Sequence, residues 1–267
     1  MNFSILMSVY YKEMVSNVER CIKSIFQSTM LPSQIVIVTD GPQNDQMNVL
    51  LESLRKDKRF LIVGYEFNRG LGYALDFGLS FVDHDLVMRM DTDDVVLQYR
   101  FELQSKFMID NDLDISSGFI EEYQNIDNGK PLGIRKVPLN IREINKQFPW
   151  RSPFNHMAVC FRKSAIKRIG GYESIDLYED YYLWWKAYNV LNYANIDKIL
   201  VRATFYYRQI ARRSGILMLK RELVFQFKCF LIHKRISFLL IGFVRVFVRL
   251  VPAGLMKKIY SIFLRSR

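Results

Sequence analysis

Cysteine and long apolar runs are both scarce in this sequence. The three cysteines, Cys21, Cys160 and Cys229, are odd in number and far apart. We therefore expect neither a disulfide framework nor a cysteine metal site, and a reducing compartment is the simpler interpretation. Between residues 236 and 264 the longest run without a charge has nine residues, whereas a transmembrane helix needs about twenty. The N-terminus lacks the basic and apolar segments of a signal peptide, so we expect none.

Low-complexity segments and internal repeats are absent as well. Apolar residues make up 50% of the 267 positions, which is enough for a substantial core and argues against disorder. The length is typical of one large domain or two small ones.

Positive charge is concentrated at the C-terminal end. From Arg212 to Arg267 there are thirteen Lys or Arg residues and one acid, Glu222, which gives +12. Since the whole chain carries +11, residues 1–211 carry −1. The body therefore gives no general indication of nucleic-acid binding, and the basic end needs its own explanation.

The first ninety residues alternate between apolar runs of strand composition and segments of helical periodicity. Residues 16–19 match a capping box and predict a helix that ends at Pro32. The predicted strands are 3–10, 34–39, 60–65 and 86–90, with further helices at Met47 to Leu54 and from Asn68 to about Val82. This order predicts an α/β fold with a mainly parallel sheet and helices on both faces.

Polar residues follow three of these strands, at Ser8 to Tyr11, at Asp40, and at Asp91 to Asp94. Ligands bind beyond the carboxyl ends of strands in such sheets, so we expect the three groups to meet in one crevice. Asp91 and Asp93 are carboxylates at i and i+2, and hard divalent cations prefer oxygen ligands. The motif is short, however, and on its own an acidic turn that caps a helix is the commoner interpretation.

Beyond residue 110 the periodicity is weaker. The predicted elements are a hairpin at Asn128-Gly129, a strand over 157–161, a short helix closed by Gly170-Gly171, a helix from Glu179 to about Leu191, a strand over 199–207 and basic helices from about Ser214.

Six segments in sequence order resemble family 2 glycosyltransferases: FSILMSVYYKE, QIVIVTDGP, NRGLGYALDFGL, MDTDD, HMAVCFRKSAIKRIGGY and YEDYYLWWKA. The resemblance covers about residues 3–210, and in detail the chain is similar to bacterial transferases that build O-antigen or capsule repeats. It implies a GT-A (nucleotide-diphospho-sugar transferase) domain over 1–211. Residues 1–110 would bind the nucleotide-sugar and 111–211 the acceptor. A basic tail of C-terminal amphipathic helices over 212–267 would follow.

The resemblance implies a base-binding site at the first two strand ends. Ser8, Val9 and Tyr10 match the loop that holds the nucleotide base, and Tyr10 suits base stacking. Asp40 matches the acid that accepts a hydrogen bond from the uracil imide, although Thr39 stands where many relatives carry a second Asp. Without the resemblance, Asp40 is better explained as an ordinary turn residue.

The resemblance also implies a diphosphate and metal site. Arg69 and Gly70 match the segment that faces the nucleotide and its diphosphate, where glycine permits close backbone approach. Asp91, Thr92 and Asp93 match the D-x-D motif, in which Asp91 contacts the ribose or the metal and Asp93 ligates it. The implied cofactor is Mn²⁺ or Mg²⁺.

Glu179 and Asp180 match the family's ED motif. An acceptor hydroxyl must lose its proton as it attacks, and a carboxylate in a partly desolvated cleft can serve as general base. The resemblance therefore implies Asp180 as the base, with Glu179 orienting it. The alternative is that both carboxylates only stabilise a helix N-terminus, by about 0.3–1 kcal/mol.

Candidate acceptor residues are His156, Trp184 and Trp185. His156 precedes a predicted strand where the family often places a polar residue near the acceptor, although lone histidines are usually structural. One tryptophan is expected in the core and the other in the sugar site. The basic run at 208–213 is equally compatible with a diphosphate clamp and with a solvated face.

The basic tail has an amphipathic pattern over 236–264. Arg245 and Arg249 are one helical turn apart among Phe and Val residues, which is typical of helices that lie in the membrane interface near anionic lipid. A core helix packed on the body is one alternative. A nucleic-acid patch is the other, but the apolar content exceeds what phosphate binding needs.

Together these features predict an inverting, metal-dependent glycosyltransferase at the cytoplasmic face of the bacterial inner membrane. It would move a hexose from a UDP-sugar to a sugar on undecaprenyl diphosphate during O-antigen, lipopolysaccharide or capsule synthesis, without a nucleic-acid partner. A nucleotidyltransferase of related α/β fold is an alternative, but SVYYKE lacks the glycine of a phosphate-cradling loop. A non-enzymatic membrane or nucleic-acid binder is another, but it gives no reason for acids to converge.

Overall fold

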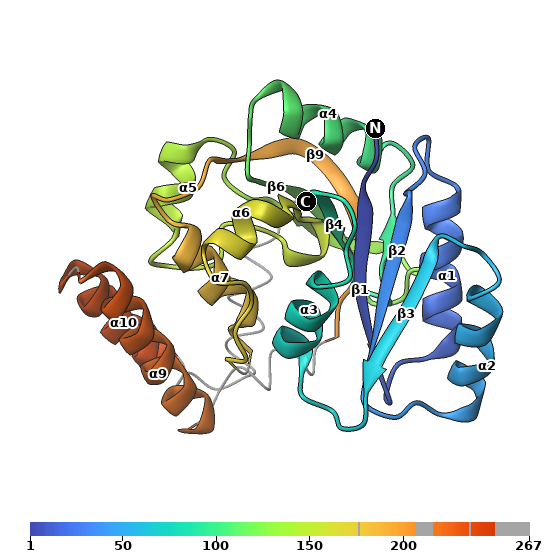
Figure 1. The fold of residues 1–267 in the computed structure, drawn as a ribbon. Coiled ribbons are helices and arrows are strands. Elements are labelled where there is room, and N and C mark those ends of the chain that lie inside the picture. The colour runs from blue at the N-terminus through green and yellow to red at the C-terminus, as the bar shows by residue number, and fades with distance from the viewer. Residues whose placement is uncertain (176, 207–215, 235, 249–267) are drawn as a thin grey trace.

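The computed structural model describes residues 1–175, 177–206, 216–234 and 236–248. One sheet passes through the molecule in the order β3-β2-β1-β4-β8-β6-β9-β5, with β7 paired to β6. Helices cover both faces of this sheet (Figure 1). The predicted α/β fold class is confirmed.

The N-terminal half is parallel, as predicted, because each apolar strand is followed by a helix that returns the chain to the same edge. Its elements are β1 (Ser4–Tyr10), α1 (Val15–Phe26), β2 (Gln34–Asp40), α2 (Asp45–Leu54), β3 (Phe60–Tyr65), α3 (Leu71–Leu79) and β4 (Leu86–Arg89). Side chains alternate along β2: Val36 and Val38 pack with α3, whereas Ile35 and Ile37 pack with α1. The sheet is thus buried on both faces.

The start of α1 differs from the prediction. The helix begins at Val15, with Met14 as its N-cap, so residues 16–19 do not form a capping box. Instead, the Glu13 carboxylate accepts hydrogen bonds from the Met14 backbone at 3.0 Å and the Asn17 amide at 2.9 Å. Glu13 thus holds the residue that precedes the helix, although no side chain caps the amides of its first turn.

The second half of the sheet is mixed, because β8 lies antiparallel between β4 and β6. Asn128-Gly129 lies in the connection between the antiparallel strands β6 and β7, so the predicted hairpin is confirmed. The elements are β5 (Val95–Val96), α4 (Arg100–Asp110), β6 (Ile115–Tyr123), β7 (Pro131–Arg135), α5 (Ile141–Gln147), η1 (His156–Ala158), β8 (Cys160–Arg162), α6 (Lys163–Arg168), α7 (Glu179–Ala187) and β9 (Tyr193–Thr204).

The C-terminal helices α9 (Ile216–His233) and α10 (Ile236–Val248) form a hairpin that lies beside α7 (Figure 1). Met218, Phe225, Cys229 and Phe238 of this hairpin belong to the same hydrophobic cluster as the α7 side chains. The hairpin therefore shares its core with the rest of the molecule. No helix in the described ranges combines the length and the apolarity needed to cross a bilayer.

Arg245 is not at the surface, where the sequence pattern placed it. Its side chain is buried and forms an ion pair with Glu222, with 2.9 Å between Arg245 Nε and Glu222 Oε1. The lipid contact predicted for Arg245 is therefore wrong. Arg249, its predicted companion, lies outside the described residues.

Candidate functional site

The three polar strand ends meet at one edge of the sheet, as predicted. Tyr10 at the end of β1 is paired in register with Asp40 at the end of β2. The Met90 amide donates to the Leu6 carbonyl at 3.2 Å, which brings the end of β4 beside β1. The Thr92 hydroxyl then donates to Glu13 at 3.2 Å and joins the acidic turn to the loop after β1.

Asp91, Asp93 and Asp94 form an acidic cluster after β4, in which one oxygen from each lies within 4.8 Å of the others. Burial, together with the charges of Asp91 and Glu13, raises the pKa of Asp93 to about 7. Burial also raises the pKa of Asp94, with Asp93 and Asp91 adding to the effect. The three carboxylates repel one another when no cation is bound. Their oxygens are ligands of the kind that Mn²⁺ and Mg²⁺ prefer, so the cluster fits such a cation.

Asp94, which the sequence did not single out as a ligand, has a structural contact as well. Its Oδ1 accepts a hydrogen bond from the Thr204 amide at 2.8 Å, which ties the acidic turn to β9. Its buried Oδ2 has no hydrogen-bond partner in the described chain. This oxygen therefore has an unused capacity for a proton or a cation.

Two buried arginines support the acidic turn. Arg89, at the end of β4, pairs with Asp91, with 2.5 Å between Nη2 and Oδ1. Arg100 on α4 donates from Nη2 to the carbonyls of Arg89 at 2.9 Å and Val159 at 3.3 Å. Neither residue was predicted from the sequence, although a charged residue within an apolar strand, such as Arg89, indicates that its buried charge will need a partner.

Asp40 organises the loop between β3 and α3. Its carboxylate is buried and accepts hydrogen bonds from the Tyr65 hydroxyl (2.8 Å), the Asn68 amide (2.9 Å) and the backbone amides of Arg69 (2.7 Å) and Gly70 (3.0 Å). A uracil imide would have to displace one of these donors. The uracil contact stays a prediction, and Asp40 has a positioning role in the loop that holds Arg69 and Gly70.

The other residues predicted to bind the donor differ in how far their side chains are exposed to solvent. Tyr10 is 37% exposed, and Ser8 is partly exposed. Val9 is wholly buried in the core, so its side chain is unavailable to a ligand and only its backbone can take part. Arg69 is exposed, with its guanidinium 3.5 Å from the centre of the Tyr73 ring.

Glu179 and Asp180 form the first turn of α7 and are partly buried. Tyr172, in the segment that precedes α7, is buried. Burial raises the pKa of its hydroxyl, and the charges of Asp180 and Glu179 raise it while that of Arg89 lowers it. The charges of Arg89 and of the Glu179–Asp180 pair therefore both act on the Tyr172 hydroxyl.

Comparisons with known proteins decide the family. The profile described as glycosyl transferase family 2 matches residues 4–170, which is more than half of the chain. This chain belongs to glycosyl transferase family 2.

Curated relatives extend the family likeness to almost the whole chain. An Escherichia coli protein, UDP-Gal:alpha-D-GlcNAc-diphosphoundecaprenol beta-1,3-galactosyltransferase, is 37% identical over 263 residues, which cover 97% of this chain and 95% of the relative. The amylovoran biosynthesis glycosyltransferase AmsE of Erwinia amylovora is 32% identical over 264 residues, which cover 97% of this chain and 98% of AmsE. The chain is therefore a glycosyltransferase.

Solved structures support the GT-A fold. S. aureus TarS 1-349, crystallised in complex with UDP-GlcNAc, has a TM-score of 0.66 and 17% identity, over 85% of this chain and 66% of that chain. At this identity the likeness shows the fold alone.

The candidate acceptor residues of this family 2 enzyme are buried. Trp184 is 0% and Trp185 is 1% exposed, so neither can line a sugar site, and the expectation for the second tryptophan is wrong. The hairpin explains the burial of Trp185, because Phe238 covers it with 4.8 Å between ring centres, whereas Trp184 packs against Phe154 at 5.2 Å. His156 is also buried, with its Nε2 3.1 Å from the Tyr172 hydroxyl, and burial lowers its pKa. His156 therefore has a structural contact with Tyr172 and is not exposed to an acceptor.

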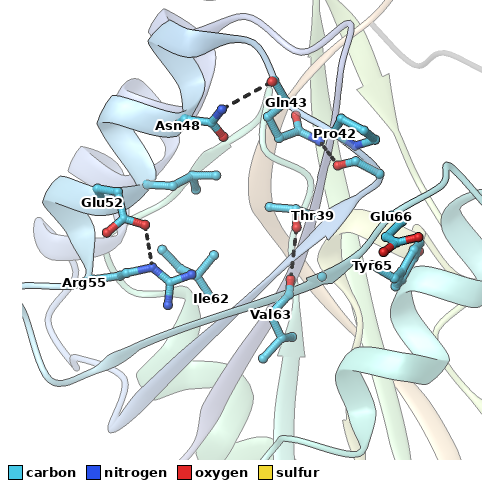
Figure 2. Close-up of a pocket in the computed structure, with 13 residues that line it drawn as sticks. Thr39, Pro42, Gln43, Asn48, Glu52, Arg55, Ile62, Val63, Tyr65 and Glu66 are labelled. Atoms are coloured by element: carbon cyan, nitrogen blue, oxygen red, sulfur yellow. Dashed lines mark hydrogen bonds and ion pairs between the residues drawn. The ribbon is translucent and has the colours of Figure 1, made fainter.

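A pocket of about 520 Å³ lies between α2 and the ends of β2 and β3 (Figure 2). None of Asp91, Asp93 and Asp94 lines it. Thr39 lines this pocket and donates to the Val63 carbonyl at 3.3 Å. Asp40, the next residue, faces the α3 side of the sheet because successive side chains of a strand alternate. None of the donor-site residues predicted from the sequence lines this pocket. The basic run at 208–213 lies outside the described residues.

Proposed function

We propose that this glycosyltransferase moves a hexose from a UDP-sugar to a sugar carried on undecaprenyl diphosphate, with inversion, in bacterial surface polysaccharide synthesis. The observation that carries the proposal is the acidic cluster at the edge of the sheet where β1 and β2 end, with Glu179 of α7 packed against Gly72, directly after the loop that Asp40 holds. The name of the Escherichia coli relative supports the choice of UDP-sugar and lipid-linked acceptor.

On the donor side, Asp91 and Asp93 would hold Mn²⁺ or Mg²⁺. Such a cation neutralises charge on the departing nucleoside diphosphate. Two contacts hold the acidic turn in position for the cation. Arg89 forms an ion pair with Asp91, and the Thr92 hydroxyl donates a hydrogen bond to Glu13. Exposed Arg69 and the backbone of Gly70 would face the diphosphate, held by their hydrogen bonds to Asp40.

On the acceptor side, Asp180 accepts the proton of the attacking hydroxyl, and Glu179 orients it. The acceptor oxygen forms a bond to the anomeric carbon as the bond to the UDP oxygen breaks, and UDP leaves with that electron pair. A single displacement from the opposite face inverts the anomeric centre. Both carboxylates lie in the first turn of a helix, whose N-terminal dipole favours their charged forms.

The hairpin would hold the enzyme at the cytoplasmic face of the inner membrane as a peripheral protein. The exposed apolar side chains of α9 and α10 are Leu223, Val224, Phe227, Leu231, Ile232, Ile236, Leu240, Phe243, Val244 and Phe247. Glu222 is the only acid after residue 211, and it is buried and paired with Arg245. An apolar face without opposing negative charge suits a surface rich in anionic lipid.

A donor and acceptor screen tests this function. Purified protein is given UDP-, dTDP- and GDP-hexoses with short-chain lipid-diphosphate GlcNAc or GalNAc, in Mn²⁺, Mg²⁺ or EDTA, and products are identified by mass spectrometry. We expect hexose transfer from a UDP-sugar that needs a divalent cation and gives the inverted linkage by NMR. Transfer that is undiminished in EDTA, or that retains the anomeric configuration, would contradict the proposal.

Asp180→Asn tests the base separately, because it removes the proton acceptor while it keeps the shape of the side chain. We expect UDP affinity within about twofold of the parent and transfer reduced by about 10²–10⁴-fold, the usual contribution of a general base. Weakened UDP affinity with normal turnover would assign Asp180 to the donor site instead.

A further inference from the structure

The hairpin of α9 and α10 holds the two tyrosines that flank the proposed catalytic pair. Tyr178 precedes Glu179, and its hydroxyl donates to Glu222 Oε2 of α9 at 2.5 Å. Tyr181 follows Asp180, and its hydroxyl accepts from Arg245 Nη1 of α10 at 2.7 Å. The first turn of α7 is therefore held on both sides of the two carboxylates.

A ring of the hairpin lies against both tyrosines. Phe225 stacks on Tyr178, with 4.5 Å between ring centres and 17° between ring planes. It also stacks on Tyr181, at 4.9 Å and 29°. Since all three rings are buried, this contact sets the spacing between α9 and the start of α7.

The ion pair inside this contact is fully enclosed. Glu222 is 0% and Arg245 is 8% exposed, and Gln226 donates a further hydrogen bond to Glu222 Oε1 at 2.7 Å. Arg245 also donates to the Pro149 carbonyl at 3.2 Å. A buried ion pair rarely stabilises a protein more than well-packed apolar side chains would, whereas its directional bonds restrict how two elements can slide or rotate. The pair is therefore better suited to fixing geometry than to adding stability.

We infer that Glu222 and Arg245 are positioning residues for Asp180: through Tyr178 and Tyr181 they fix the turn of α7 that carries the base. The inference rests on the proposed function, in which Asp180 takes the acceptor proton. A tail that sequence alone presents as a membrane anchor is in this view also part of the catalytic framework. Misplacement of a reacting group by about 1 Å can cost 10²-fold in rate, so a small shift of this turn is sufficient for a large effect.

The test replaces the ion pair by apolar side chains of similar size in the full chain. The double variant Glu222→Leu/Arg245→Met removes both charges, so no unpaired charge remains buried and the melting temperature is expected to stay near that of the parent. We expect kcat to fall by about 10–100-fold, with UDP affinity and the donor KM within about twofold. The substrates are the donor and acceptor pair selected by the screen.

The control is Lys228→Met, which removes another tether of α9, the ion pair with Glu173 at 3.1 Å, without touching Tyr178 or Tyr181. It is expected to keep kcat. Arg245→Lys keeps the charge but lacks the forked geometry of the guanidinium, and it is expected to recover only part of the lost rate. If the double variant does not fold, Arg245→Lys alone carries the test, with the same expectation of lowered kcat at unchanged UDP affinity.

Four outcomes are decisive. A folded double variant with the kcat of the parent overturns the positioning role, as does Arg245→Lys with unchanged kcat where the double variant does not fold. A kcat that falls only in proportion to UDP affinity also overturns it. If instead Asp180→Asn transfers sugar normally, the proposed base is wrong, and the positioning of Asp180 falls with it.

Discussion

A Cβ atom at Gly72 would lie 2.9 Å from the Cβ of Glu179 and 2.8 Å from the carbonyl oxygen of Glu173. Gly72 is in the first turn of α3, directly after the loop that Asp40 holds, and Glu179 opens α7. The donor loop and the turn with the proposed base are therefore in contact through two helix starts, and only glycine leaves room for that contact.

Gly72→Ala should separate the two helix starts. Alanine is the better helix former by about 1 kcal/mol, so any loss of stability can be assigned to the contact itself. We expect a lower melting temperature and a kcat reduced by about tenfold, measured by thermal unfolding and sugar transfer. Ser80→Ala, at the exposed C-cap of the same helix, is the control and should change neither the melting temperature nor kcat appreciably. Unchanged stability and rate in Gly72→Ala would contradict the contact.

Asp93 should make the metal-free enzyme less stable at high pH. Its pKa in the folded state is about 7 against an ordinary 3.8, so the folded state binds its proton more tightly than the unfolded state. The resulting stability is complete below pH of about 4 and is lost as the pH rises through about 7. In EDTA at pH 8, Asp93→Asn should therefore melt higher than the parent, by about 2–4 °C for each kcal/mol recovered.

Divalent cation should reverse this order. We expect Mn²⁺ to raise the melting temperature of the parent more at pH 8 than at pH 6, because a cation competes with the proton on Asp93, and to have little effect on Asp93→Asn. Sugar transfer by Asp93→Asn should be lost. Asp197→Asn, an exposed acid on β9, serves as control and should shift the melting temperature by less than about 1 °C. If Asp93→Asn melts below the parent in EDTA at pH 8, the charge of Asp93 does not destabilise the metal-free folded state, and the prediction is wrong.

Asp40 and Thr39 offer a matched pair, because the two neighbours face opposite sides of β2. Asp40→Asn replaces an acceptor oxygen by a donor amide among four donors, so we expect a loss of about 1–3 kcal/mol in stability and at least about tenfold weaker UDP binding. Thr39→Val should keep UDP affinity. Denaturant unfolding and calorimetric UDP titration measure both effects. An Asp40→Asn variant that stays stable but no longer binds UDP would instead favour direct contact with the base.

The outer face of the hairpin should carry membrane binding. Phe227→Glu and Phe243→Glu each place a negative charge at a side chain that is 59% exposed, so both should weaken co-sedimentation with anionic vesicles while transfer to a soluble short-chain acceptor persists. Val49→Glu, at an exposed position of α2, is the control. Parent protein that stays in solution with anionic vesicles at low salt would refute the anchor. Size-exclusion chromatography that shows a dimer, lost in both variants, would assign the face to a second copy.

The N-terminal half could be predicted because its strands are plain apolar runs, each followed by the polar residues that the site uses. The second half could be predicted only in part, because several of its buried positions are polar. Arg100 and Gln104 on α4 are fully buried, and Gln104 donates to the Ser116 and Ala158 carbonyls, so neither the helix nor β6 has a clean apolar face. The partners of these side chains come from distant parts of the chain, and periodicity within one segment carries no information about them.

The C-terminal hairpin also depends on contacts that the sequence of one segment does not reveal. Arg245 looks interfacial because its partner Glu222 lies on the preceding helix, and only the folded hairpin brings the two together. Trp184 and Trp185 on α7 looked like one core residue and one site residue. Trp185 is buried because Phe238 of the hairpin covers it, whereas Trp184 packs against Phe154 in the body of the protein.

The packing of Trp185 against Phe238 has a practical consequence for engineering this enzyme. A fragment cut near residue 211 would leave Tyr178, Tyr181 and Trp185 as an uncovered aromatic surface next to the catalytic turn, and such surfaces promote aggregation. Chimaeras that exchange acceptor specificity between relatives should therefore carry the hairpin together with α7. The unit that can be exchanged or expressed extends at least through Val248.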